Sequence, residues 1–144
     1  MKVKSFRGML ADGEVRTIRL STNDGLTGYR IVKFQIIGEK PAGANQESVV
    51  QVWSVEPSAS SAEINFEIPT LLGAAYLEGA ADAKTESQAQ IIIFDHVKFN
   101  QDIYITHTDS ETGENCNYYL ELEQVKLSKD EATVATLKDM RGRE

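Results

Sequence analysis

The sequence has 144 residues, of which 41% are hydrophobic and 26% are charged, and its formal net charge is −7. This length suits one domain with one core, the composition excludes a disordered chain or a coiled coil, and the acidic balance argues against general binding to nucleic acid. The longest apolar run, residues 91–94, is too short for a membrane span, and the first residues lack the apolar stretch of a signal peptide.

Short segments of alternating apolar and polar residues, bounded by Gly, Pro, Asn and Asp, recur from the start of the chain to about residue 127. Such alternation predicts many short strands rather than alternating strands and helices. In chain order, the expected strands are 3–10, 15–21, 29–37, 49–55, 64–68, 72–77, 89–94, 102–108 and 117–127. Turns are expected over 11–13 and 23–25 and loops over 38–48, 56–62 and 79–87, while a short helix over 71–78 is an alternative to the sixth strand.

The strand expected over 49–55 is apolar on both faces, with Trp53 on the same face as Val49 and Val55. A strand of this kind is either central in its sheet or covered by a partner.

The end of the chain carries two further signals. The polar connection 109–114 between the last two expected strands predicts a β-hairpin. Ser128 and Glu131 form a capping box, which predicts a helix over about 129–140 with a modest apolar stripe of Ala132, Val134, Ala135 and Leu137. The expected fold is therefore one mainly β domain over 1–144, an antiparallel β-sandwich or barrel-like structure with a short C-terminal α-helix.

The sequence offers no constellation for nucleophilic catalysis or for metal binding. Cys116 is the only cysteine, and neither His96 nor His107 lies in a GxSxG or HExxH context. The stretch 109–114 has the acidic character of a calcium loop without its residue order. We therefore expect no catalytic residue, no metal and no cofactor, and we expect the protein not to be an enzyme.

Two weaker signals could point to carbohydrate chemistry. Glu121 and Glu123 share one face of a strand, roughly 6.5–7 Å apart, which is compatible with a carboxylate pair but is also what a solvated strand face shows. Tyr118 and Tyr119, with Trp53, could form a platform for stacking sugars, although large aromatic residues more often fill cores and interfaces.

The charge is distributed unevenly along the chain. Residues 1–40 carry a net charge of +4, and residues 41–144 carry −11. The basic segment could pair with acidic groups of its own chain, which is the more common arrangement, or with a neighbouring subunit. The candidate subunit-interface residues are Arg7, Arg30 and the apolar anchor Trp53; Arg16 and Arg19 are weaker candidates, because Arg16 can pair within its own sheet edge.

Strand patterns also carry a resemblance to a known group of proteins. The segments 18–22, 28–36 and 117–124, the start MKVKSFRG, the length and the short helical end resemble small, mostly uncharacterised proteins of marine tailed bacteriophages. The resemblance covers most of the chain and transfers no functional residue. It implies a virion structural protein, first a capsid decoration or cement protein and second a tail or neck component.

This resemblance implies partners and a location as well. The expected partners are other virion proteins, such as the major capsid protein or tail subunits, and copies of the chain itself, without direct contact to nucleic acid or membrane. The expected location is the virion, after synthesis in the host cytoplasm. The alternative function is a carbohydrate- or ligand-binding β-sandwich that works as a monomer.

Overall fold

The computed structural model describes residues 2–20, 26–41, 43, 45–79 and 89–142. The elements in chain order are β1 (Lys2–Leu10), β2 (Val15–Ile18), β3 (Thr27–Gly38), β4 (Gln46–Trp53), β5 (Leu71–Gly79), β6 (Ala89–Phe94), β7 (Ile103–Asp109), β8 (Cys116–Lys126) and α1 (Lys129–Gly142). The turn expected over 23–25 and nearly all of the loop expected over 79–87 lie outside the described residues. No helix in the described ranges is long and apolar enough to cross a membrane.

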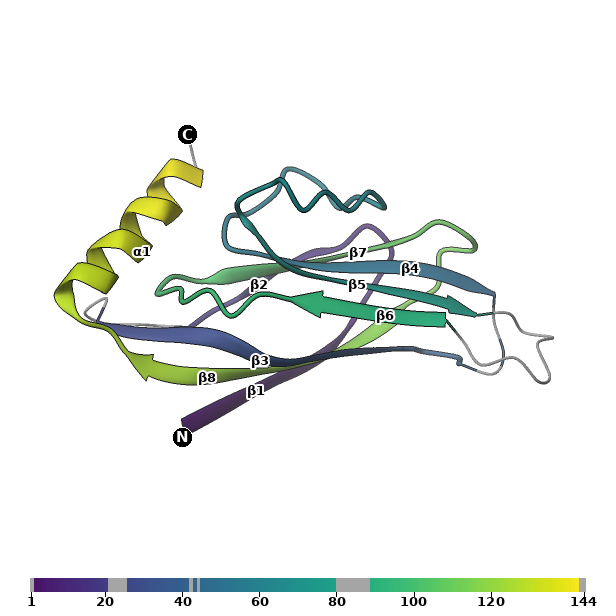
Figure 1. Ribbon diagram of the computed structural model, residues 1–144. Coiled ribbons are helices and arrows are strands. Elements are labelled where there is room, and N and C mark those ends of the chain that lie inside the picture. Colours follow the sequence, from purple (N-terminus) through teal and green to yellow (C-terminus); the bar gives the residue numbers. More distant parts are fainter. Residues whose placement is uncertain (1, 21–25, 42, 44, 80–88, 143–144) are drawn as a thin grey trace.

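The strands form two antiparallel sheets that pack face to face (Figure 1). The three-stranded sheet has the order β1-β8-β3, and the five-stranded sheet has the order β2-β7-β4-β5-β6. The sheets are not closed into a barrel. This confirms the predicted antiparallel sandwich with a short C-terminal helix.

The strand pairs are nested along the chain. β1 pairs with β8, β2 with β7, and β4 with β5, as in a long hairpin of eight strands rolled into two layers. Such nesting is the connectivity of a jelly roll. β6 departs from it, because it pairs with β5 rather than with β3, but the Gln90 Nε2 group at its start donates to the Ile36 carbonyl of β3 (2.6 Å).

One hydrophobic cluster joins the inner faces of both sheets. From the three-stranded sheet, β3 and β8 contribute the alternate residues that point inward. From the five-stranded sheet, β4, β5 and β7 contribute the residues that face them. The cluster members with no exposed surface are Leu10, Ile31, Phe34, Val50, Val52, Ile103, Ile105, Cys116, Leu120 and Leu122. Burial of this apolar surface is the main term that holds the two sheets together.

The strand predicted over 64–68 is wrong, and the segment forms turns. The Asn65 side-chain oxygen accepts from the Glu67 amide (3.0 Å), the Ile68 amide donates to the Asn65 carbonyl (3.2 Å), and the Leu71 amide donates to the Ile68 carbonyl (3.2 Å). Asn and Pro favour such local hydrogen bonds, which here replace a sheet ladder. The next segment is strand β5, not the alternative helix.

The β-hairpin predicted around 109–114 is also wrong. β7 belongs to the five-stranded sheet and β8 to the three-stranded sheet, so the connection passes from one layer to the other. Asp109 organises this passage, because its carboxylate accepts hydrogen bonds from the amides of Glu47 (3.0 Å), Glu111 (3.1 Å) and Glu114 (2.6 Å). The polar composition correctly predicted a turn, but it could not show that the strands on either side of this turn pair with different neighbours.

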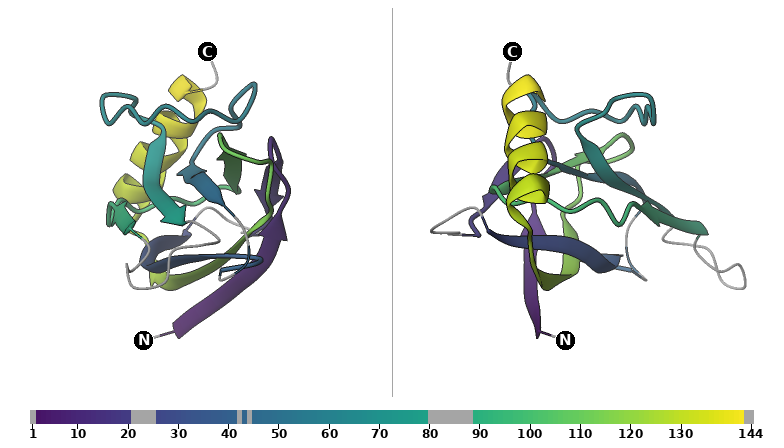
Figure 2. Two further views of the ribbon diagram at one scale, coloured as in Figure 1. Left: turned by 90° about the vertical axis from the view of Figure 1, so that its right-hand side faces the viewer. Right: turned by 60° about the vertical axis from the view of Figure 1, so that its left-hand side comes forward.

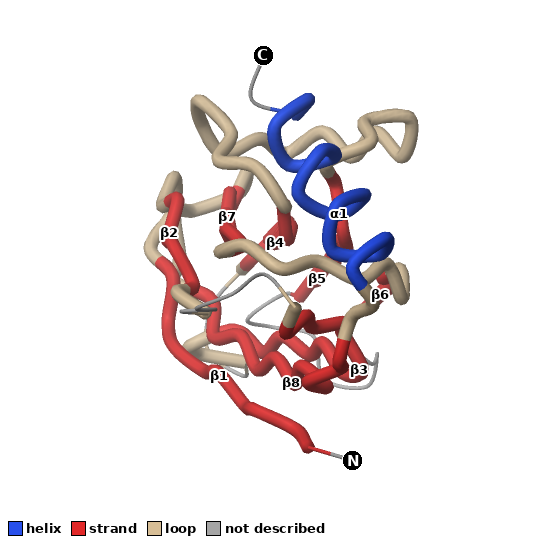
Figure 3. The backbone as a smooth tube through the Cα atoms, turned by 90° about the vertical axis from the view of Figure 1, so that its left-hand side faces the viewer, coloured by secondary structure: helices blue, strands red, loops and turns tan. Residues whose placement is uncertain are grey.

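The predicted capping box forms at the start of α1. The Glu131 amide donates to Ser128 Oγ (3.1 Å), and the Ser128 amide donates to Glu131 Oε1 (3.2 Å). The helix lies at one end of the sandwich (Figures 1 and 3). Lys98 Nζ, in the segment before β7, contacts Glu131 Oε2 at 2.6 Å. The expected apolar stripe is divided, because Ala132 and Ala135 are half-buried while the other two members, Val134 and Leu137, are exposed.

Candidate functional site

The outer face of the three-stranded sheet carries two of the sequence-predicted interface residues, Arg7 and Arg30. On β8, Tyr118, Leu120 and Leu122 point to the core, so Tyr119 and Glu121 point outward. The strand register places the alternate residues of β1 and β3 on the same side. We call this surface the outer face; it comprises Val3, Ser5, Arg7, Met9, Arg30, Lys33, Gln35, Ile37, Asn117, Tyr119, Glu121 and Glu123.

No described element covers the outer face (Figures 1 and 2). Its exposed apolar side chains are Val3, Met9 and Ile37, with 40%, 42% and 56% of their surface accessible. Sequence reasoning did not single out Met9 or Ile37. The signal was present, because each is an apolar residue on the polar side of an alternating strand.

The two glutamates of the outer face are held by neighbouring side chains. Arg30 donates to Glu123 Oε2 through Nη2 (3.0 Å) and Nε (3.3 Å). The Tyr119 hydroxyl donates to Glu121 Oε1 (3.1 Å), and Lys33 Nζ lies 5.7 Å from the centre of the Tyr119 ring. Glu121 and Glu123 therefore take part in a surface network of the sheet, which supports the solvated-face interpretation over a catalytic pair.

Arg7 differs from Arg30 in having no such partner. It forms none of the ion pairs found among the described residues and is exposed on the edge strand β1. With Met9 it lines a groove of about 780 Å³, which also includes Gln35, Ile37, Asn117 and Tyr119 of the outer face and reaches Gly8, Ile36, Tyr118 and Gln90 outside that face. In the strand register, Tyr119 of β8 lies between Arg7 and Gln35, and Asn117 lies between Met9 and Ile37.

Trp53, the third interface candidate, lies on the other sheet and is only 8% exposed. β4 is the middle strand of the five-stranded sheet, which confirms the central-strand alternative for this doubly apolar segment. Trp53 packs against Leu71 and Tyr104, and its Nε1 group donates to Thr106 Oγ1 (3.2 Å). Its apolar surface is thus covered within the chain, and we do not retain it as an interface anchor.

The possible sugar-stacking platform is not present. Tyr118 is buried on the inner face of β8, whereas its neighbour Tyr119 lies on the outer face and Trp53 lies on the opposite sheet. Strand alternation separates adjacent tyrosines in this way.

Arg16 of the edge strand β2 is engaged within its own chain, but its partners lie in the preceding turn and in β1 of the other sheet rather than in its own sheet edge. Its Nε group donates to Glu14 Oε2 (2.7 Å) and its Nη2 group to the Met9 carbonyl (2.9 Å). It is therefore engaged inside the chain.

A buried serine–histidine pair has the spacing of a nucleophile and a base but no access. Ser48 Oγ lies 2.9 Å from His107 Nε2, and His107 Nδ1 faces the Ala11 carbonyl at 3.1 Å. Neither side chain has exposed surface. Burial also raises the pKa of the nearby Cys116 thiol to about 12, which keeps it protonated at neutral pH. These groups form a structural polar network of the core.

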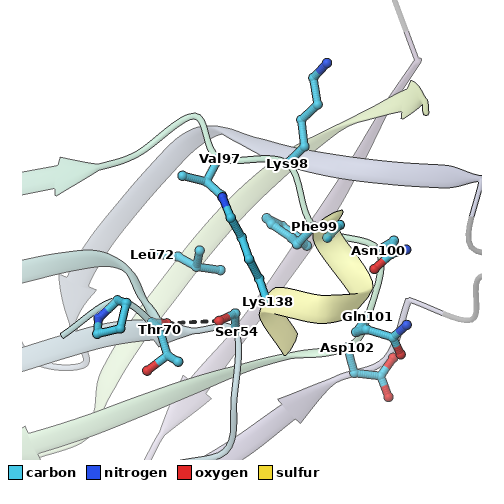
Figure 4. A pocket seen from close by; sticks show the side chains of 12 residues that line it. Ser54, Thr70, Leu72, Val97, Lys98, Phe99, Asn100, Gln101, Asp102 and Lys138 are labelled. Atoms are coloured by element: carbon cyan, nitrogen blue, oxygen red, sulfur yellow. Dashed lines mark hydrogen bonds between the residues drawn. The ribbon is translucent and has the colours of Figure 1, made fainter. Parts of the chain in front are cut away.

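A pocket of about 350 Å³ lies between α1 and the segment before β7 (Figure 4). Leu72, Val97 and Phe99 supply apolar walls, and Lys138 of α1 extends across the opening towards Val97 (Figure 4). Asp102 at its margin already accepts a hydrogen bond from the Leu20 amide (2.9 Å). Its volume falls within the range of small-molecule sites and its walls are apolar, so we assign the ligand-binding alternative to this pocket.

In the acidic connection 109–114, backbone amides donate hydrogen bonds to the carboxylate of Asp109. The carboxylates do not form a ring around a cation position. Among the described residues, no group of three His, Cys, Asp or Glu side chains is placed to hold a metal ion.

Comparison with protein-family models gives no match, and comparison with curated proteins gives no match either. A functional proposal must therefore be built from the residues and surfaces described above.

Proposed function

We propose that the protein is a non-enzymatic structural component of a tailed-bacteriophage virion, present in repeated copies. Capsid decoration is the first role and a tail or neck position the second. The proposal draws on the resemblance of the strand segments and on the strand nesting, which follows a jelly roll in all strands but β6; jelly rolls are found in viral capsid domains as well as in lectins and cupins. Because one fold serves many functions, the fold is supporting analogy only.

The observation that carries the proposal is the uncovered outer face. It combines exposed apolar residues, an arginine without an ion pair among the described residues and a tyrosine in a shallow groove. Arg, Tyr and Met are enriched in protein interfaces. In the proposed role, the outer face contacts another virion protein or another copy of the chain, in a virion assembled after synthesis in the host cytoplasm.

Charge reversal of Arg7 tests the proposal. Arg7→Glu is expected to reduce incorporation into particles strongly while leaving the melting temperature nearly unchanged, because Arg7 forms no ion pair in the described chain. Arg30→Glu is expected to lower both the incorporation and the melting temperature, because it places a second negative charge beside Glu123. Incorporation is measured by quantifying the protein in purified particles.

Arg19→Glu is the matched control, since Arg19 is an exposed arginine outside the outer face. Normal incorporation of the Arg7→Glu protein would contradict the proposal. The ligand-binding alternative is distinguished by solution mass and a glycan array: a protein that stays monomeric and binds a glycan at the pocket beneath α1 would replace the virion role.

A further inference from the structure

The loop between β4 and β5, residues 54–70, is acidic, whereas the outer face carries Arg7, Arg30 and Lys33 beside Glu121 and Glu123. It carries Glu56, Glu63 and Glu67, and there is no Lys or Arg anywhere between residues 41 and 83. All three glutamates are exposed, and none takes part in the ion pairs found in the described chain. We call residues 54–70 the acidic loop.

The acidic loop also exposes apolar side chains. Ile64, Phe66 and Ile68 have 38%, 63% and 37% of their surface accessible. Phe66 stands between Glu63 and Glu67 in the sequence, so the tip of the loop combines a large aromatic group with two carboxylates.

Hydrogen bonds from the sheet hold the acidic loop in one shape. The buried Gln51 of β4 donates through Nε2 to the carbonyls of Ser61 and Glu63, both at 3.1 Å. Thr108 of β7 donates to Ser60 Oγ (2.8 Å), and Asn65 organises the turn at the tip. A loop that is already ordered loses little conformational freedom when it binds.

The outer face offers a complementary surface. Arg7 and Lys33 form no ion pair among the described residues, and they lie on the two outer strands, two residues out of register and about 12 Å apart on the sheet. Met9 and Ile37 face each other across the groove. The groove therefore combines the apolar Met9 and Ile37 with the cation of Arg7, and Lys33 lies on the same face outside the groove, opposite Glu121. The tip of the acidic loop presents apolar groups beside anions.

The two surfaces cannot meet within one molecule. The acidic loop lies over the five-stranded sheet, and the outer face is on the opposite side of the sandwich (Figures 1 and 2). Two sheet layers, about 10 Å apart, separate them.

We propose that the tip of the acidic loop of one copy docks into the groove on the outer face of the next copy, with Phe66 between Met9 and Ile37. Glu63 and Glu67 then lie near Arg7 and Lys33. The inference rests on the proposed function as a repeated subunit and names the partner of the outer face as a second copy of this chain. Because each bound copy still offers a free loop, the contact is head-to-tail and produces a ring or a filament rather than a closed two-fold dimer.

Mixing two half-blocked variants tests the head-to-tail contact. Arg7→Glu blocks the groove and leaves the loop intact; the double substitution Phe66→Ala with Glu67→Lys blocks the loop and leaves the groove intact. The wild type is expected to grow in mass with concentration by light scattering after size-exclusion chromatography. Each variant alone is expected to remain monomeric, and an equimolar mixture is expected to form a 1:1 dimer and nothing larger.

Ile91→Ala is the matched control, because Ile91 is an exposed apolar residue on β6, 60% accessible, outside both surfaces. It should assemble as the wild type does. A monomeric wild type at all concentrations, a mixture that stays monomeric, or either blocked variant that assembles normally would overturn the inference.

Particle incorporation separates this inference from the proposed function. If the loop-blocked variant enters particles normally while Arg7→Glu does not, the outer face contacts another virion protein, and the second copy is the wrong partner. If the wild type assembles head-to-tail in solution but is absent from particles, the inference stands and the virion role fails.

Discussion

At the scale of single residues, Asp109 shows how one buried carboxylate directs the chain between layers. Burial by itself would raise its pKa, but the hydrogen bonds from the amides of Glu47, Glu111 and Glu114 outweigh that effect and hold the pKa below its ordinary value. The unfolded chain titrates this group near a pKa of about 3.9. The stabilisation from Asp109 is therefore complete above about pH 4 and is lost as the pH falls through the lower folded-state pKa.

Asp109→Asn is expected to lower the free energy of unfolding at pH 7 by about 1–3 kcal/mol, because the amide nitrogen cannot accept the hydrogen bonds that the carboxylate accepts. The variant should also lose less stability than the wild type between pH 4 and pH 2. Urea unfolding at pH 7 and at pH 3 measures both effects. Glu111→Gln, at an exposed neighbour, is the control, and an unchanged acid dependence in Asp109→Asn would contradict the assignment.

At the scale of elements, α1 is the part of the fold that the sequence specifies most directly. The reciprocal bonds between Ser128 and Glu131 satisfy two amides at its start, and both partners are three residues apart in the sequence. Its attachment depends on distant residues, because Asn100 Nδ2 donates to Thr136 Oγ1 (3.1 Å) and Lys98 pairs with Glu131.

Ser128→Ala is expected to cost about 0.5–2 kcal/mol of stability and to reduce the helical signal in circular dichroism, because the Glu131 amide loses its acceptor. The measurement is thermal unfolding followed in the far ultraviolet. Ser58→Ala, at an exposed serine of the acidic loop, controls for loss of a hydroxyl group. Equal stability of the two variants would show that the cap does not contribute.

β3 illustrates a limit of strand reasoning at the same scale. Simple alternation places Val32, Phe34 and Ile36 on one face. In the structure the register against β8 shifts between Ile31 and Lys33, so that Ile31 and Phe34 are both fully buried and Val32 is half-buried. A β-bulge inserts one residue and changes the face of those that precede it, which alternation alone does not reveal.

At the scale of the whole molecule, the ends of the chain depend on each other. β1 pairs with β8 over its full length, and β2 pairs with β7, so neither sheet is complete until residues about a hundred positions apart meet. One core cluster then joins the two sheets.

This topology predicts a single cooperative unfolding transition and slow folding, in the range of milliseconds to seconds. Trp53, the only tryptophan, reports on the five-stranded sheet, whereas far-ultraviolet circular dichroism reports on all the strands. The two probes are expected to give the same midpoint in urea. Separate midpoints would show that the sheets unfold independently.

The sequence by itself determined what depends on near neighbours: the β class, the inward and outward sides of β8, the turn over 11–13 and the capping box. It also placed Arg7 and Arg30 among the candidates for a contact surface. Alternation and capping act over a few residues, so their signals are local.

Only the tertiary structure decided which strands share a sheet, and that decided the roles of the candidate residues. It separated β7 from β8, and it covered Trp53 with its own chain. It paired Arg30 with Glu123, 93 positions away, and gave Arg7 no such partner among the described residues. These outcomes depend on contacts between distant segments that compete for the same core and the same edges, and no local pattern encodes that competition.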